Sequence, residues 1–194
     1  IYDDAQCSIN VNNMLTEWFQ TESGVKQGDT LSPTLFNIFI NDLVTDINNL
    51  ELGVSIGDTN LSILLYADDI ILIADSAEDL QIMLDTVYRW SMKFMIKFNA
   101  KKSNIVHFRS PRSLKTDFNF HLGNVNLDIV TQYKYLGIIL NEFLDYNVTA
   151  QTLSEAANRA LGAIINKYKS INGLSYYTYT RLVQSGVNPI LDYC

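Results

Sequence analysis

The stretch LLYADDIILIA, residues 64–74, is the most apolar in the chain, yet two adjacent aspartates, Asp68 and Asp69, lie in its middle. A buried carboxylate without a partner costs several kcal/mol or shifts its pKa until it is neutral. The residues on either side, 62–66 and 70–74, have the composition of short apolar strands. The stretch therefore predicts a β-hairpin that exposes both aspartates at its tip while its strands are buried.

Two neighbouring carboxylates repel each other unless a proton or a divalent cation lies between them. Magnesium prefers hard oxygen ligands and is commonly held by one or two carboxylates together with substrate phosphates. A site of this kind with two metal ions activates an attacking hydroxyl and stabilises the leaving oxygen in phosphoryl transfer. An ordinary Asp-Asp turn is the alternative interpretation, and the pair alone does not decide between the two.

Composition indicates an ordered globular protein, because 47% of the 194 residues are hydrophobic and 18% are charged. No apolar run is long enough to cross a bilayer, and no stretch is typical of a signal peptide. The two cysteines, Cys7 and Cys194, have no metal-binding spacing, so we expect an intracellular protein, nuclear or cytoplasmic. The chain begins at Ile1, and we expect it to be part of a longer protein.

The charges are distributed unevenly along the chain, whose net charge is −7. No acidic residue occurs between Thr86 and Thr116, a segment that holds most of the positive charges. These are Arg89, Lys93, Lys97, Lys101, Lys102, Arg109, Arg112 and Lys115. The pattern favours a local basic surface that binds a polyanion, with a plain solvated face as the alternative.

Residue patterns in the first part of the chain predict both strands and helices. Residues 5–22 have the pattern of a strand, an Asn-Asn turn and a second strand. A glycine loop, SGVKQGDT, leads to Ser32 as N-cap and Pro33 at the first position of a helix over about 33–49. Ser76 and Asp79 form a capping box before the helix that follows the hairpin.

Further strands are predicted at residues 105–108, 118–122 and 133–140. From about Thr149 the pattern becomes helical, with an end at Asn172-Gly173 and a second helix over 176–187, before Asn188-Pro189. We therefore expect an α+β part over residues 1–146 and a small helical part over 147–194.

Four motifs occur in a fixed order along the chain: SGVKQGDTLSP at 23–33, YADD at 66–69, NAKKS at 99–103 and YKYLG at 133–137. Together they resemble the motifs of reverse transcriptases. The sequence GVKQGDTLSP, together with NPILDYC at the end of the chain, is most similar to the non-LTR (LINE-type) retrotransposon branch. The resemblance implies the second half of a polymerase palm, an antiparallel sheet with the Tyr-x-Asp-Asp hairpin packed on helices, followed by a helical thumb region.

The resemblance also implies roles for individual residues. Asp68 would be the main metal ligand and Asp69 a supporting one, for Mg²⁺ or in its place Mn²⁺. Lys102 would be a catalytic residue that protonates or neutralises the pyrophosphate leaving group, with Lys101 as an alternative one position away. The remaining roles are binding of the nucleotide or template by Gln27, Gly28, Tyr66 and Ala67, and a primer grip formed by Tyr135, Leu136 and Gly137. A plain β-hairpin is the alternative for the last group.

The implied activity is RNA-directed DNA polymerase, which extends a DNA primer on an RNA template with dNTPs; no membrane is implied. The family's metal site also needs an aspartate in an earlier Phe-x-Asp strand. Asp3 and Asp4 do not match, because no apolar strand precedes them. We therefore expect weak or absent activity from this chain alone. A non-catalytic palm remnant that contacts nucleic acid or protein is the alternative function.

Two groups of residues, a pair of histidines and three tyrosines, are expected to have structural roles. His107 and His121 lie on predicted strands without the spacing of metal ligands, so we expect structural roles. The tyrosines Tyr176, Tyr177 and Tyr179 are expected to pack in a core, with base stacking as the alternative.

Overall fold

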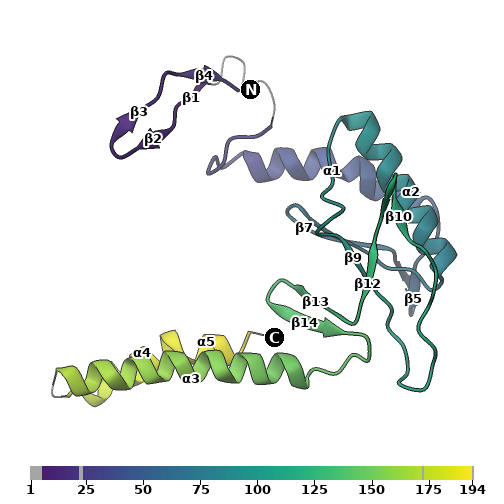
Figure 1. The fold of residues 1–194 in the computed structure, drawn as a ribbon. Coiled ribbons are helices and arrows are strands. Elements are labelled where there is room, and N and C mark those ends of the chain that lie inside the picture. Colours follow the sequence, from purple (N-terminus) through teal and green to yellow (C-terminus); the bar gives the residue numbers. More distant parts are fainter. Residues whose placement is uncertain (1–5, 22–23, 172, 194) are drawn as a thin grey trace. The chain divides into compact units, whose positions relative to one another are not determined.

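The computed structural model describes residues 6–21, 24–171 and 173–193 (Figure 1). Asp3, Asp4, Ser23 and Asn172, which the sequence analysis singles out, lie outside the described residues. The chain forms two compact units. The first comprises Ile1–Phe98 with His121–Asn124, and the second comprises Asn99–Phe120 with Val125–Cys194.

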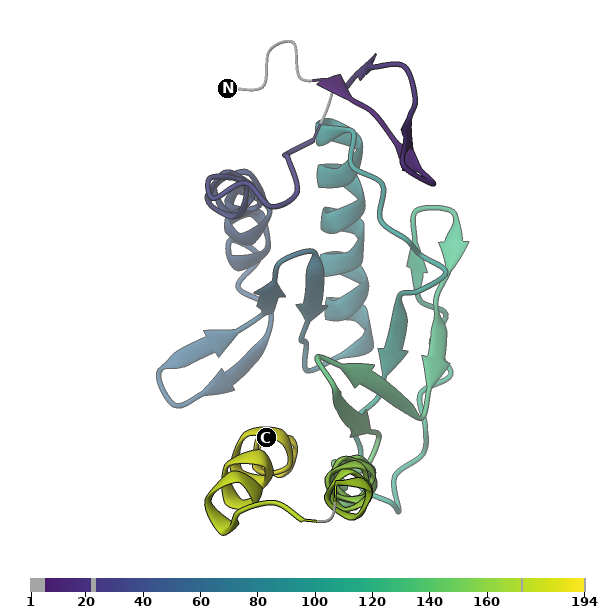
Figure 2. The same ribbon diagram turned by 90° about the vertical axis from the view of Figure 1, so that its left-hand side faces the viewer.

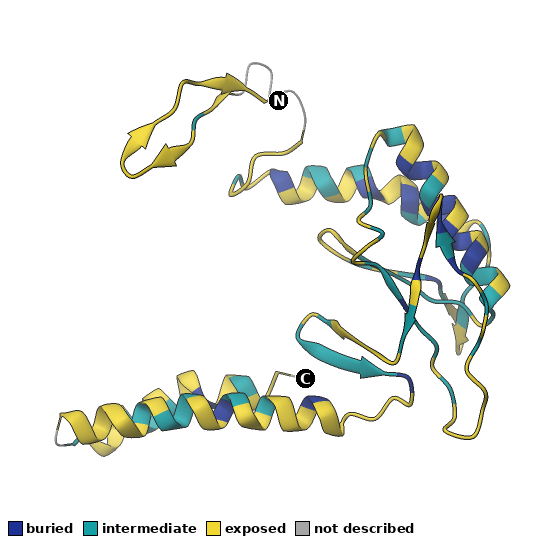
Figure 3. Cartoon of the chain, in the orientation of Figure 1, coloured by how far each residue is buried: buried dark blue, intermediate teal, exposed yellow. Residues whose placement is uncertain are grey.

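The first unit begins with a two-stranded ribbon. Strand β1 (Gln6–Cys7) pairs with β4 (Phe19–Gln20), and β2 (Asn10–Val11) pairs with β3 (Met14–Leu15), all antiparallel. Asn12 and Asn13 form the tip with φ angles of 52° and 65°, a conformation that asparagine tolerates better than most residues. The predicted strand, Asn-Asn turn and strand are confirmed, and the ribbon is exposed over nearly its whole length (Figure 3).

Helix α1 (Ser32–Asn48) buries one face through Ile40, Leu43 and Ile47, which recur at helical spacing. The predicted helix is confirmed, but the predicted cap is wrong. Leu31 is the N-cap and makes no capping hydrogen bond through its side chain. The hydroxyl of Ser32 instead donates to the carbonyl of Lys26, so it closes the preceding loop onto the start of the helix.

Helix α2 (Ala77–Phe94) begins at the predicted cap, since the hydroxyl of Ser76 accepts a hydrogen bond from the Asp79 amide at 3.1 Å. Its buried face packs against α1 (Figure 2). The centre of this contact is aromatic: the ring centroid of Trp90 lies 5.4 Å from that of Phe39 and 4.8 Å from that of Phe94. The two helices thus form the core of the first unit.

Two short hairpins follow α1. Strands β5 (Val54–Ile56) and β6 (Thr59–Leu61) form one that the sequence analysis does not predict. Strands β7 (Ile63–Tyr66) and β8 (Asp69–Leu72) form the predicted one. Between the hairpins the buried hydroxyl of Ser62 donates to Asn48 Oδ1 at 2.7 Å, which attaches the strands to the end of α1.

The strands of the second unit are short. β9 (Asn104–Val106) and β12 (Asp128–Val130) form a parallel pair, while β13 (Gln132–Tyr135) and β14 (Ile138–Asn141) form an antiparallel hairpin. Between β9 and β12 along the chain lie the two-residue strands β10 (His121–Leu122), which belongs to the first unit, and β11 (Val125–Asn126). The strands predicted at 105–108 and 118–122 are therefore present but shorter than expected.

The helical region consists of α3 (Asn147–Ser170), α4 (Tyr176–Gly186) and α5 (Asn188–Leu191). The two longer helices confirm the prediction, whereas α5 is not predicted; Pro189 lies in its first turn, where proline is favourable. Contacts group these helices with β9 and β12–β14 in one compact unit. The domain division at 146/147 stays a prediction.

The tyrosines of α4 correct one expectation. Tyr176 and Tyr177 are 84% and 66% exposed, so the prediction that they pack in a core is wrong for both. Neighbouring helix positions point in different directions, so one buried face cannot hold them all. The ring of Tyr177 instead lies 5.4 Å from the guanidinium of Arg181.

Helices and small, mostly antiparallel sheets together make an α+β protein, as predicted. Across the described residues, none of the helices combines the length and the apolar character that crossing a bilayer requires.

Candidate functional site

The tip of the β7–β8 hairpin presents the two aspartates. Tyr66 and Asp69 are the last paired residues, so Ala67 and Asp68 form the two-residue connection. All four side chains are exposed, as the sequence predicts for the aspartates. The carboxylates are therefore accessible to a ligand, and the aromatic ring of Tyr66, at 64% exposure, lies beside them in the sequence.

The strands that carry this tip are less buried than predicted. In β7 the burial alternates, with Ile63 and Leu65 half-buried and Leu64 41% exposed, and in β8 the three apolar residues are half-buried. Among the described residues the sheet contains only these two strands, and a sheet this small buries less of each strand than a larger one. The expectation of fully buried strands is wrong for this part of the chain.

Ala67 has a φ angle of +51°, a left-handed conformation that is uncommon for residues other than glycine. The ladder on both sides holds it there, because β7 and β8 pair over their full length and the amide of Ile73 donates to the carbonyl of Ser62 at 2.9 Å. Backbone strain of this kind persists only where the surrounding structure fixes it, and it is frequent at functional sites. The tip is thus a rigid support for Asp68.

The donor chemistry of Asp68 and Asp69 fits a hard divalent cation, because both offer exposed carboxylate oxygens on one tight turn. The set is nevertheless incomplete: within the described ranges no cluster of three or more His, Cys, Asp or Glu side chains could hold a metal ion. Further ligands would have to come from another segment or from substrate phosphates.

The glycine loop precedes α1 in the same unit. Gly28 has a φ angle of +84°, and a Cβ atom built on it would meet nothing within 4 Å, so its backbone is open to close approach by a ligand. Asp29 Oδ1 accepts a hydrogen bond from the Leu31 amide at 3.0 Å and shapes the turn into the helix. Gln27 is exposed, as a contact residue must be. The roles of Gln27 and Gly28 stay predictions.

Lys102 lies in the second unit, in the turn before β9. Its amide donates to the Asn99 carbonyl at 2.9 Å, and its own carbonyl accepts from Asn104 Nδ2 at 3.1 Å. The side chains of Lys102 and its neighbour Lys101 are both exposed. The backbone of the turn is therefore fixed while its ammonium groups face solvent, and a role beside the aspartates of the first unit stays a prediction.

Tyr135, Leu136 and Gly137 surround the tip of the β13–β14 hairpin, where Leu136 and Gly137 have φ angles of +46° and +88°. Positive φ at both central residues is the geometry of a tight hairpin turn. Two residues that the sequence analysis does not single out contact this hairpin: Thr149 bonds to Ile139, and Tyr193 bonds to Leu136. No local sequence pattern could have found the second contact, because it joins residues 57 positions apart.

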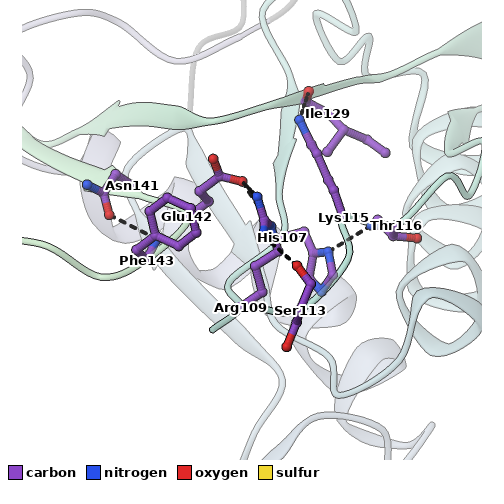
Figure 4. A network of polar contacts seen from close by, with 9 residues as sticks. All are labelled: His107, Arg109, Ser113, Lys115, Thr116, Ile129, Asn141, Glu142 and Phe143. Atoms are coloured by element: carbon purple, nitrogen blue, oxygen red, sulfur yellow. Dashed lines mark hydrogen bonds and ion pairs between the residues drawn. The ribbon is translucent and has the colours of Figure 1, made fainter. Parts of the chain in front are cut away.

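The basic stretch is only partly available to a polyanion (Figure 4). Arg109 Nη2 lies 2.8 Å from Glu142 Oε2 and its Nη1 donates to the Ser113 carbonyl at 2.6 Å, with both charged side chains largely buried. Lys115 Nζ donates to the Ile129 carbonyl at 3.0 Å. Arg109 therefore maintains the fold, and Lys115 makes a contact within the protein although it is exposed, as are Lys101, Lys102 and Arg112.

Both histidines make structural contacts. His107 Nδ1 accepts a hydrogen bond from the Thr116 amide at 3.0 Å, which closes the loop after β9 (Figure 4). The backbone of His121 pairs with the side-chain amide of Gln81 on α2, since its N–H donates to Oε1 at 3.0 Å and its carbonyl accepts from Nε2 at 3.0 Å. These contacts agree with the structural roles expected from the sequence.

Comparison with known proteins identifies the family. Residues 2–140 match the family described as "Reverse transcriptase (RNA-dependent DNA polymerase)". The chain is 31% identical, over 144 residues, to the Retrovirus-related Pol polyprotein from type-2 retrotransposable element R2DM of Drosophila melanogaster; the match covers 71% of this chain and 14% of that protein.

Two further relatives come from other insects. The RNA-directed DNA polymerase from mobile element jockey of Drosophila funebris is 32% identical over 131 residues, which are 64% of this chain and 14% of that protein. The Retrovirus-related Pol polyprotein from type-1 retrotransposable element R2 of Popillia japonica is 32% identical over 147 residues, 70% of this chain and 23% of that protein. The chain thus spans less than a quarter of the length of these relatives. It belongs to the reverse transcriptase family, among the non-LTR retrotransposon proteins.

Proposed function

We propose that this chain is the polymerase palm and the start of the thumb of an RNA-directed DNA polymerase from a non-LTR retrotransposon. The observation that carries the proposal is the rigid turn that exposes Asp68 and Asp69 at the tip of β7–β8 in a member of the reverse transcriptase family. The reaction is transfer of a nucleotide from a dNTP to the 3′-hydroxyl of a DNA primer on an RNA template.

Each site residue has a task in this reaction. Asp68 and Asp69 would hold Mg²⁺, or Mn²⁺ in its place, and the bound cation would supply activation of the primer hydroxyl and neutralisation of phosphate charge. The ammonium of Lys102 would neutralise or protonate the pyrophosphate that leaves.

Three parts of the chain would position the substrates. The open backbone at Gly28, together with Gln27, would contact the incoming nucleotide or its template base. Tyr66 and Ala67 would lie along the primer terminus, and the turn of Tyr135, Leu136 and Gly137 would hold the primer. An intracellular location, nuclear or cytoplasmic, and a palm–thumb division near residue 147 are part of the same proposal.

The alternative is a palm remnant without catalysis that contacts nucleic acid or protein. The observation that favours it is the incomplete set of carboxylates, because the described residues bring no third acid to Asp68 and Asp69. Loss of one ligand of a metal site removes several kcal/mol of transition-state stabilisation. We therefore expect slow extension from this chain by itself.

Calorimetric titration of Mn²⁺ tests the proposal, with primer–template and dNTP present. Asp68→Asn should abolish the binding seen for the unchanged chain, because it removes the main carboxylate. Asp58→Asn is the matched control: Asp58 is an exposed aspartate in the connection between β5 and β6, another two-residue turn of the same unit. Its substitution should leave Mn²⁺ binding unchanged.

Primer extension on an RNA template with Mg²⁺ gives the second readout. Slow extension that Asp68→Asn abolishes and Asp58→Asn preserves would support the polymerase. Equal Mn²⁺ binding by all three chains, with no extension by any of them, would contradict it and favour the remnant.

A further inference from the structure

The turn of the β13–β14 hairpin is contacted by a tyrosine from the far end of the second unit. The hydroxyl of Tyr193 donates a hydrogen bond to the carbonyl of Leu136 at 2.8 Å. Its ring lies directly on Gly137: a Cβ atom at Gly137 would be 2.9 Å from Cε1 of Tyr193. One side chain therefore makes a polar contact with the first residue of the turn and an apolar contact with the second.

The conformation of the turn explains why such a contact matters. Leu136 has a φ angle of +46°, which is uncommon for a branched side chain, and Gly137 follows at +88°. A two-residue connection leaves the carbonyl of its first residue outside the strand ladder, where water or a side chain must satisfy it. Tyr193 provides this partner, and its ring occupies the space that glycine leaves open.

A second side chain holds the same hairpin from helix α3. The hydroxyl of Thr149 accepts from the Ile139 amide and donates to the Ile139 carbonyl, both at 3.0 Å. Thr149 is 3% exposed, so both bonds are shielded from water. It therefore satisfies both polar groups of a residue in the middle of β14.

The two contacts come from one packed group of helices. Helix α5 packs against α3 and α4, and Tyr193 follows two positions after the end of α5 at Leu191. Thr149 lies in the first turn of α3. The helices thus contact the hairpin at its tip and in the middle of one strand.

We propose that Tyr193 is a positioning residue, which fixes the β13–β14 turn so that the helical region sets where that turn lies. The role in holding a primer terminus rests on the proposed function. The fixing of the turn does not rest on it, because it follows from the contacts of Tyr193 with Leu136 and Gly137. The two parts are therefore tested separately.

The first test is amide hydrogen exchange of the turn and of β14 in Tyr193→Phe, which removes the hydroxyl and keeps the ring. Loss of one hydrogen bond should raise exchange at these amides by about three- to tenfold. The matched control is Tyr176→Phe, at a tyrosine that is 84% exposed, and it should change nothing. Equal exchange in all three chains would overturn the positioning role.

A pair of variants tests the ring itself and keeps the role falsifiable if one variant folds poorly. Gly137→Ala places a methyl group against the ring, so it should loosen the turn and displace Tyr193. In a Tyr193→Ala background, the same change should loosen the turn less, because no ring opposes the methyl group. If the effects of Gly137→Ala and Tyr193→Ala on amide exchange of the turn simply add in the double variant, the ring does not control the turn.

The second test measures binding of an RNA template with an annealed DNA primer, against the same duplex without a recessed 3′ end. Tyr193→Phe should weaken binding of the duplex with the recessed 3′ end by about three- to tenfold, the range expected for one hydrogen bond. It should leave binding of the duplex without a recessed 3′ end unchanged. A purely structural role would weaken both or neither, and either result would overturn the primer role.

The two readouts also separate failure of the inference from failure of the proposed function. If the unchanged chain binds neither duplex while exchange responds to Tyr193→Phe, the polymerase proposal and the primer role are overturned and the fixing of the turn stands. If both duplexes bind and exchange does not respond, the inference alone is overturned.

Discussion

Backbone conformation at single residues determines two of the turns described above. Ala67 and Leu136 have positive φ angles at the tips of β7–β8 and β13–β14, although neither is glycine. Gly53 is a contrasting case, because its φ angle is +141° and a Cβ atom there would lie 2.7 Å from the carbonyl oxygen of Leu61. Alanine can adopt the backbone conformations of residues 67 and 136 at some cost. At position 53 it would also collide with the backbone of Leu61.

Gly53→Ala is therefore expected to destabilise the first unit. Strain of this type costs about 1–3 kcal/mol, and the close contact with Leu61 places the loss toward the upper end of that range. Gly162 is the matched control, since it lies inside α3 and a Cβ atom there meets nothing within 4 Å. Gly162→Ala should instead stabilise the chain by about 0.5–1 kcal/mol.

Urea unfolding followed by circular dichroism measures both changes. A lower midpoint for Gly53→Ala together with a higher one for Gly162→Ala is the expected result. Similar midpoints for the two variants would contradict the conformational argument.

At the scale of elements, one largely buried ion pair connects the segment after β9 to the end of β14. The side chains of Arg109 and Glu142 are 15% and 11% exposed, and the Arg109 amide also donates to the Glu142 carbonyl at 2.8 Å. The guanidinium in addition lies 4.9 Å from the ring of Phe143. Removal of one partner would leave the other charge buried without compensation.

Glu142→Gln is expected to destabilise the second unit by about 3 kcal/mol, the lower end of the cost of breaking a buried pair. Glu155→Gln is the control, because Glu155 is exposed on α3 and accepts a hydrogen bond from Gln151 at 3.2 Å; surface changes of this kind stay within about 0.5 kcal/mol. Thermal unfolding compares the two. Equal midpoints would mean that the pair contributes nothing to the unit.

Sequence patterns predict the helices of this chain better than its strands. The apolar spacing of Leu43 and Ile47 in α1, and the cap at Ser76 before α2, are local features, so these two helices could be predicted to within a few residues. Strand β12 is not predicted although β9 is, because pairing of Ile129 with Ile105 depends on residues far apart in the sequence.

In the candidate site, too, local features could be predicted from the sequence and contacts between distant residues could not. The exposure of Asp68 and Asp69 could be predicted, because a turn between two apolar runs is a local pattern. The partial burial of strands β7 and β8 could not be predicted, because burial depends on which other elements pack against the sheet. The contact of Tyr193 with Leu136 and the pairing of Arg109 with Glu142 are likewise set by tertiary packing.

For the whole molecule, charge limits how nucleic acid can bind. The chain has 21 acidic residues and 14 lysines and arginines, so the duplex of the proposed function would have to be held by a local group of cations, and salt would release it. Lys101 is exposed in the turn before β9, whereas Lys115 already donates to the Ile129 carbonyl. Lys115 is also exposed, but one of the three N–H donors of its ammonium is engaged within the protein, so the Lys101 ammonium is the more available of the two for a phosphate.

Lys101→Gln is therefore expected to weaken duplex binding and to reduce the slope of log affinity against log salt by about one. Lys115→Gln should reduce this slope less, because its ammonium already donates to a carbonyl of the protein. Fluorescence anisotropy of a labelled primer–template over a range of salt concentrations measures both. Identical slopes for Lys101→Gln and the unchanged chain would remove Lys101 from the phosphate contacts.

The parallel pairing of β9 with β12 has a consequence for how the chain folds. The hairpins β7–β8 and β13–β14 pair residues that are close in the sequence, and hairpins of this kind form within about 1–10 μs. The β9–β12 pair can form only after the chain between them, residues 107–127, has closed into a loop. Closing such a loop costs chain entropy before any contact compensates for it, so we expect the parallel pair to form after the two hairpins.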